Sequence, residues 1–137
     1  MAETRIINIA DVPLADHGDG GAFVAKIGRA APLVGSLGLG CSLTVVPPGK
    51  RAYPFHRHHV NHELFYILSG SGEYRLDDKR LALRAGDLIA APAGKEAHQI
   101  ANTSSSELRF LATDPISFDW SRVWKASPAL ALSPISG

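Results

Sequence analysis

Short apolar runs follow one another along most of this chain, and Gly, Pro or Asp closes each of them. Such runs predict β-strands that are joined by turns. No segment shows a sustained helical period. We expect strands over residues 5–9, 22–27, 41–46, 51–58, 62–69, 73–76, 80–84, 88–91, 97–102 and 107–112. The pattern therefore predicts an all-β sandwich or barrel.

Two of these runs carry more detail. Leu108, Phe110 and Ala112 alternate with Arg109 and Leu111, which predicts one buried face and one outer face, because side chains alternate across a strand. Residues 64–68 are apolar at every position. This pattern is typical of a central strand covered on both sides, or of a strand that is buried in a dimer.

Two regions lie outside this strand pattern. Residues 29–40 are rich in Gly, but a strand follows them instead of a helix, so we expect a flexible connection and not a phosphate-binding loop. Residues 114–137 contain Trp120 and Trp124 among small residues and prolines. We expect a single domain over residues 1–137, with the barrel at about 20–113 and a C-terminal extension at 114–137.

Composition narrows the class of protein. Apolar residues make up 45% of the 137 residues, charged residues 20%, and the net charge is +1. The chain has no basic run and no long apolar segment, so we expect neither nucleic acid nor a membrane as partner. Cys41 is the only cysteine, which excludes an internal disulfide, and we expect it to be a buried small side chain. No signal peptide follows Met1, so the expected location is cytoplasmic.

The candidate chemistry lies in two segments. His56 and His58 are two residues apart on an expected strand, so their side chains share one face. Glu63 can rejoin that face from the next strand. His98 lies in a later segment that begins with Gly86 and contains Pro92 and Gly94. Three imidazoles and a carboxylate suit a first-row transition metal.

The two segments resemble the two motifs of the cupin superfamily, Gly-x5-His-x-His-x(3–4)-Glu-x6-Gly and Gly-x5-Pro-x-Gly-x2-His-x3-Asn. In this chain the first runs from Gly49 to Gly70, and the second ends at Asn102. Each has one extra residue, before His56 and before His98 respectively, at places where a loop can absorb it. The resemblance implies a cupin double-stranded β-helix, that is, a jelly-roll barrel. It also implies one divalent metal ion per chain.

The resemblance makes His56, His58, Glu63 and His98 the metal ligands. Fe, Mn, Ni and Zn all remain candidates for the ion. Four protein ligands would leave about two positions open on an octahedral ion, whereas on zinc they would complete a tetrahedron. His59 and His62 have the opposite strand parity, so we expect them to be turn or supporting residues and not ligands.

The remaining site residues are less well determined by the pattern. We expect Phe55, Phe65, Ile67 and Leu88 to form an apolar pocket wall, with Tyr66 and Gln99 as possible polar contacts. Tyr53 and Tyr74 are further candidates for the barrel wall. No residue stands out as a general base, so the catalytic residues stay unassigned.

Three functions follow from this interpretation. The first is a metal-dependent enzyme on a small polar metabolite, acting as an oxygenase, isomerase or lyase. The second is a non-catalytic sensor or binding module for a small-molecule ligand, and the third is a structural cupin with a vestigial site. A sugar-phosphate isomerase would need basic groups near the metal, and those nearby in sequence are Lys50, Arg51, Arg57 and Arg75.

We also expect a homodimer, because a jelly roll has edge strands that must be covered. The expected contact surfaces are residues 22–27, residues 41–46 and the C-terminal extension with its two tryptophans.

Overall fold

The computed structural model describes residues 5–53, 56–58, 62–92, 94, 96–115 and 123–125. For residues 56–58 and 123–125 it describes the backbone and not the side chains. Phe55 and His59 lie outside the described residues.

The described chain is made of short strands and two 3-10 turns. In chain order the elements are η1 (Ile9–Asp11), β1 (Ala15–Gly18), β2 (Val24–Arg29), η2 (Ala31–Val34), β3 (Leu39–Val46), β4 (His56–His58), β5 (Glu63–Ser69), β6 (Ser71–Leu76), β7 (Lys79–Arg84), β8 (Leu88–Ala91), β9 (His98–Ala101), β10 (Leu108–Pro115) and β11 (Val123–Lys125).

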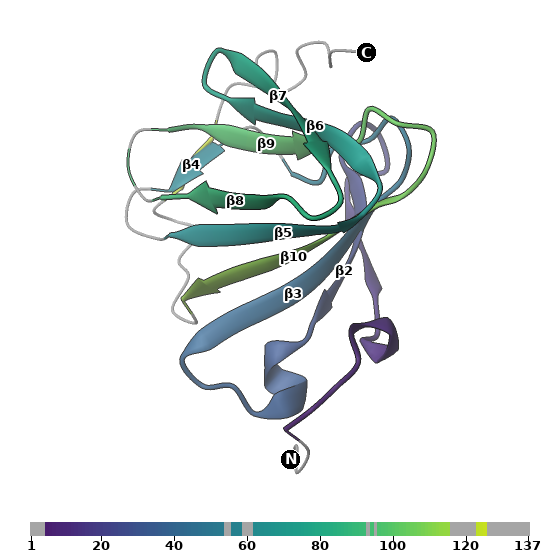
Figure 1. The fold of residues 1–137 in the computed structure, drawn as a ribbon, viewed down its shortest axis with the longest axis vertical. Helices are drawn as coiled ribbons and strands as arrows, with labels where there is room; N and C mark the ends of the chain where they lie inside the picture. Colours follow the sequence, from purple (N-terminus) through teal and green to yellow (C-terminus); the bar gives the residue numbers. More distant parts are fainter. Residues whose placement is uncertain are drawn as a thin grey trace.

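The strands form two antiparallel sheets that face each other (Figure 1). Sheet A has the order β1-β2-β3-β10-β5-β8, and sheet B has the order β11-β4-β9-β6-β7. Neighbours such as β3 and β10 are far apart in sequence but are paired over eight residues, from Leu108 opposite Val46 to Pro115 opposite Leu39. This arrangement confirms the predicted all-β jelly-roll barrel.

The core fills the space between the two sheets. Leu108 and Phe110 are buried in it and Ala112 packs against it, which confirms the alternation predicted for this strand. Sheet A also contributes Phe65 and Ile67, and sheet B contributes Ile100. Each large apolar side chain buried in this way contributes about 1.5–3 kcal/mol to the stability of the fold.

The N-terminal segment covers one half of the outer face of sheet A. Val12 and Ala31 are buried over this face, together with Leu43 and Val45 of β3. The packing is close: a Cβ atom on Gly28 would overlap the carbonyl oxygen of Pro13. In Figure 1 this segment and η2 lie outside the barrel, beyond β2 and β3.

Several boundaries differ from the prediction. Residues 5–9 do not form a strand; instead Asn8 caps η1, its Oδ1 accepting a hydrogen bond from the backbone nitrogen of Ala10 at 2.9 Å. The Gly-rich connection contains η2, which Gly35 ends with a φ of 71°. Strand β1 was not predicted, and β11 lies within the region that was expected to be an extension.

Candidate metal centre

Two of the candidate ligands, Glu63 and His98, meet at one end of the barrel, between the two sheets. Glu63 is the first residue of β5 in sheet A, and His98 is the first residue of β9 in sheet B. Strand β4 lies beside β9, with His56 directly opposite His98 in the register. Three strands from two sheets therefore contribute to the same end of the barrel.

Glu63 and His98 are in contact inside the barrel. The distance between Glu63 Oε1 and His98 Nε2 is 3.4 Å, and the two side chains are 12% and 2% exposed. This is longer than a charge-assisted hydrogen bond, which measures about 2.7–2.9 Å. Two ligand atoms that each lie about 2.0–2.2 Å from one ion, at tetrahedral or right angles, are separated by about 3–3.5 Å. The pair therefore fits joint coordination of a metal ion.

The other two candidate ligands lie in strand β4. The structure describes the backbone of His56 and His58 and not their side chains. The described part of the chain holds no group of three or more His, Cys, Asp or Glu side chains able to bind a metal. Among the other histidines, His62 is exposed and borders a groove on the outside of sheet A.

Aromatic rings surround His98 within the barrel. The ring centroids of Tyr53 and Phe65 lie 6.0 Å from that of His98, in edge-on arrangements. Tyr74 stacks on His98 at 6.1 Å with an interplanar angle of 17°. These contacts fix the plane of the imidazole, so His98 is oriented before any ligand arrives.

Two tyrosine hydroxyls are buried beside the Glu63–His98 pair. Burial raises the pKa of Tyr53 well above its ordinary value, and the nearby Tyr74 and Glu63 raise it further. The pKa of Tyr74 is also raised, by burial first and then by Glu63, Glu96 and Asp77. Both phenols therefore stay protonated at neutral pH and can donate hydrogen bonds.

The structure places the predicted pocket residues on different sides of the sheets. Phe65 and Ile67 lie inside the barrel. Tyr66 and Leu88 lie opposite each other on the outer face of sheet A and are 42% and 65% exposed. We expected both residues to line the barrel interior, but they lie outside it, because Tyr66 has the opposite parity to Phe65 and Leu88 is its partner.

Gln99 also lies away from the expected pocket. It follows His98 on β9 and so points to the outer side of sheet B, where its Nε2 donates a hydrogen bond to the backbone oxygen of Tyr53 at 3.0 Å. Its contribution to the site is to hold the segment that carries Tyr53. Strand alternation, applied from His98, would have indicated this from the sequence.

The basic residues near the motifs do not enter the barrel where the structure describes them. Lys50 Nζ donates to the backbone oxygen of Gly21 at 2.8 Å. Arg75 lies between the inward Tyr74 and Leu76, and it shares the outer side of sheet B with Arg51 and Arg80. Arg57 has no described side chain. No described side chain of this basic set thus faces the candidate ligands.

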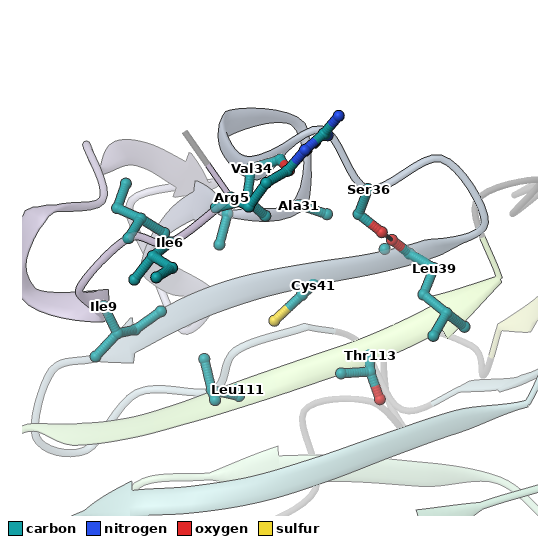
Figure 2. A pocket seen from close by; sticks show the side chains of 13 residues that line it. Arg5, Ile6, Ile9, Ala31, Val34, Ser36, Leu39, Cys41, Leu111 and Thr113 are labelled. Atoms are coloured by element: carbon teal, nitrogen blue, oxygen red, sulfur yellow. Dashed lines mark hydrogen bonds between the residues drawn. The ribbon is translucent and has the colours of Figure 1, made fainter. Parts of the chain in front are cut away.

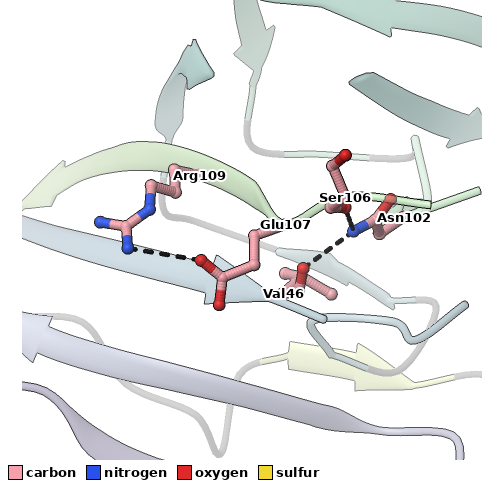
Figure 3. A network of polar contacts seen from close by, with 5 residues as sticks. All are labelled: Val46, Asn102, Ser106, Glu107 and Arg109. Atoms are coloured by element: carbon pink, nitrogen blue, oxygen red, sulfur yellow. Dashed lines mark hydrogen bonds and ion pairs between the residues drawn. The ribbon is translucent and has the colours of Figure 1, made fainter. Parts of the chain in front are cut away.

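Asn102, the last residue of the second motif, has a structural role at the other end of β9. Its Nδ2 donates to the backbone oxygens of Val46 and Ser106, at 2.8 and 2.7 Å (Figure 3). Its Oδ1 accepts from the backbone nitrogen of Ser104 at 2.9 Å. The residue therefore ties the turn before β10 to the end of β3.

Comparison with known proteins decides the family. The family model for the cupin domain matches residues 42–114, more than half of the chain. The chain belongs to the cupin family. Within the described part of this cupin, no helix has the length and apolar character needed to cross a membrane.

One curated relative of this cupin is an oxalate-binding protein from Thermotoga maritima, 37% identical over 67 residues, which are 49% of this chain and 54% of the relative. The chain thus spans about half the length of the curated relatives it matches. A solved structure of a candidate sugar phosphate isomerase from Acidithiobacillus ferrooxidans is 26% identical, with a TM-score of 0.72, and the match covers 78% of this chain and 70% of that one.

A polyketide cyclase from Streptomyces resistomycificus shows how widely the fold is shared. Its structure matches with a TM-score of 0.74 and 22% identity, over 93% of this chain and 89% of that one. At this identity the likeness shows the common fold and nothing about the reaction.

Proposed function

We propose that this cupin binds a small, oxygen-rich metabolite at one divalent metal ion, which is held by His56, His58, Glu63 and His98. The observation that carries the proposal is the buried contact between Glu63 and His98. Both side chains are largely buried there, and the rings of Tyr53 and Phe65 flank His98. Burial of such groups is costly unless they are paired or coordinate a metal ion, and one ion between them would compensate for both.

The ligand that fits best is a small carboxylate or enediolate, with oxalate as the first probe. When bound, the metal would supply positive charge for such an oxyanion and polarise its oxygen atoms. The phenols of Tyr53 and Tyr74 add neutral hydrogen-bond donors. The relative that binds oxalate supports this class of ligand.

A sugar phosphate fits less well. Recognition of a phosphate group usually requires Arg or Lys side chains or a row of backbone N–H groups. Lys50, Arg51 and Arg75, the described members of the basic set, are engaged outside the barrel. The likeness to a candidate isomerase is accordingly weaker support for this chain than the likeness to an oxalate-binding relative.

Catalysis on the same ligand is the second candidate, as an oxygenase, isomerase or lyase. The two buried phenols favour it, because neutral hydrogen-bond donors held at fixed positions can stabilise negative charge that develops on a substrate. A sensor or binding module would use the same contacts without turnover. The two candidates share one site and differ only in whether the ligand is changed.

Metal analysis followed by ligand titration tests this proposal. Protein purified without added metal should contain, or take up, about one equivalent of Fe, Mn, Ni or Zn per chain. Oxalate should then bind the metal-loaded protein, with calorimetric heat, and not the metal-free protein. Analysis of the recovered ligand by mass spectrometry separates binding from catalysis. A folded protein that takes up no metal would support the vestigial alternative instead.

We also propose that the cupin forms a homodimer through the outer face of sheet A. Leu64, Tyr66 and Leu88 form an exposed apolar surface over β5 and β8. Next to it, a groove of about 550 Å³ runs beneath the N-terminal segment and contains Cys41, Leu111 and Thr113 (Figure 2).

The chemistry of this outer face favours a second copy of the chain as its occupant. Contiguous exposed apolar patches often mark interaction surfaces. Tyr66 faces Leu88 and Leu64 faces Ala90 across the two strands, without a charged side chain in either pair. Such a face is complementary to itself, as a two-fold interface requires. β8 is also an edge strand of its sheet, and a second copy would cover that edge.

A further inference from the structure

The hydroxyl group of Tyr74 is a buried polar group in an otherwise apolar wall. Tyr74 is only 4% exposed, and it belongs to the same core cluster as Phe65 and Ile100. Among the described residues its hydroxyl oxygen has no hydrogen-bond partner. A buried hydroxyl without a partner destabilises a protein, so native structures usually satisfy it or use it.

The position of Tyr74 directs this group into the candidate metal centre. On β6 it lies between the outward residues Glu73 and Arg75, opposite Ile100 in the register of β9. Its ring lies parallel to that of His98, with centroids 6.1 Å apart. Glu63 is close enough to interact electrostatically with the phenol. Tyr74 thus stacks on one candidate ligand, His98, and interacts electrostatically with another, Glu63.

Packing alone gives no reason for a tyrosine here. A phenylalanine would stack on His98 equally well and would bury no hydroxyl. Among the described residues the extra oxygen has no acceptor, and an acceptor that enters the barrel with a ligand would make it favourable. A metal-bound oxyanion next to Glu63 and His98 would supply that acceptor.

We propose that the Tyr74 hydroxyl donates a hydrogen bond to an anionic oxygen of the ligand in the barrel, and so contributes to the selection of a small carboxylate or enediolate. This inference rests on the proposed function, because it assumes that such a ligand binds at the metal. Hydrogen bonds to charged acceptors are stronger than those between neutral groups. We therefore expect loss of the hydroxyl to weaken ligand binding by about 10-fold to 100-fold.

The test uses Tyr74→Phe, with Tyr66→Phe as the matched control. Both substitutions remove one phenolic oxygen, but Tyr66 lies on the outer face of sheet A. For wild type and both variants, we would measure Mn(II) content by elemental analysis, oxalate binding to the Mn(II)-loaded protein by calorimetry, and thermal unfolding of the metal-free protein.

The expected result has three parts. Tyr74→Phe should keep its Mn(II), bind oxalate about 10-fold to 100-fold more weakly, and unfold at the same or a higher temperature without metal, because no hydrogen bond is lost in the empty barrel. Tyr66→Phe should match the wild type in both binding measurements.

Three results would overturn the inference. Equal oxalate binding by wild type and Tyr74→Phe would refute it while leaving the proposed function intact. A clearly lower unfolding temperature of metal-free Tyr74→Phe would show that the hydroxyl serves the fold instead of the ligand. Failure of Mn(II)-loaded wild type to bind oxalate would count against the proposed function itself, and the inference would fall with it.

Discussion

Each face of strand β5 departs from the usual rule that apolar side chains are buried and charged side chains are exposed. Its inner side begins with Glu63 and continues with Phe65 and Ile67, so a carboxylate is enclosed at the end of an apolar row. Its outer side presents Leu64 and Tyr66, each 42% exposed. Buried charge and exposed apolar surface are both informative, because neither is explained by folding alone. The inner face is suited to a ligand and the outer face to another protein surface.

The largest difference between the faces should be in stability. Phe65→Ala leaves a cavity between the sheets. Phe65 is 1% exposed there, and its ring centroid lies 5.8 Å from that of Phe110. We expect this substitution to lower the free energy of unfolding by about 3–5 kcal/mol. Leu64→Ala, one residue earlier on the outer side, should cost less than about half as much in the monomer. Urea unfolding measures both, and equal losses would contradict the assignment of the two faces.

Metal binding should depend on the side chains inside the barrel and not on exposed residues that are close to them in sequence. His98→Ala removes a proposed ligand, so metal affinity should fall by at least about 100-fold. His62→Ala is the control, because His62 is exposed and directly precedes Glu63. Competition with a chromophoric chelator measures both affinities. Similar losses of metal affinity in the two variants would contradict the assignment of the buried His98 as a ligand.

Association should depend on the outer face. Leu88→Asp places a charge in the proposed dimer contact, and we expect it to raise the dimer dissociation constant at least about tenfold. Leu81→Asp is the control, because Leu81 is similarly half-exposed but lies on β7 of the other sheet. Sedimentation velocity measures the change, with circular dichroism to confirm folding. A wild-type monomer at micromolar concentration would refute the dimer.

The smallest effect concerns the pH dependence of stability. Tyr53 and Tyr74 have raised pKa values, mainly because burial disfavours the phenolate. The folded metal-free protein therefore keeps protons that the unfolded chain loses above about pH 10. The contribution of these two groups to stability should be constant below that pH and should fall as the pH rises beyond it. Tyr74→Phe should make this decline shallower, as measured by unfolding at pH 9 to 11; an unchanged decline would contradict the assigned environment.

Much of the fold could be predicted from the sequence, because local patterns determine it. The run at residues 88–91 coincides with β8, and the alternation of Leu108, Phe110 and Ala112 correctly gives the buried face of β10. The N-terminal region was harder. Residues 5–9 are apolar enough for a strand, but Asn8 caps a turn there, and β1 is a polar strand whose residues are all exposed.

For the site, the sequence indicated which strands meet but not every side-chain direction. The motif spacing placed Glu63 and His98 together, and the structure brings them to 3.4 Å. Tyr66 and Leu88 were expected inside because their strands are apolar on both faces, so hydrophobicity could not reveal the direction. Parity counted from Glu63 would have placed Tyr66 outside. Tyr53 follows no strand alternation, since it lies in the irregular segment before β4.

The central claim is that the end of the barrel holds one metal ion through three imidazoles and the Glu63 carboxylate. Pulsed electron paramagnetic resonance of the Mn(II)-loaded protein, with histidine labelled by nitrogen-15, tests it most directly, because the labelled nitrogens couple to the ion only when they bind it. We predict coupling from three histidine nitrogens in wild type and from two in His98→Ala. Mn(II) that shows no nitrogen-15 coupling, or an unchanged count in His98→Ala, would contradict the claim.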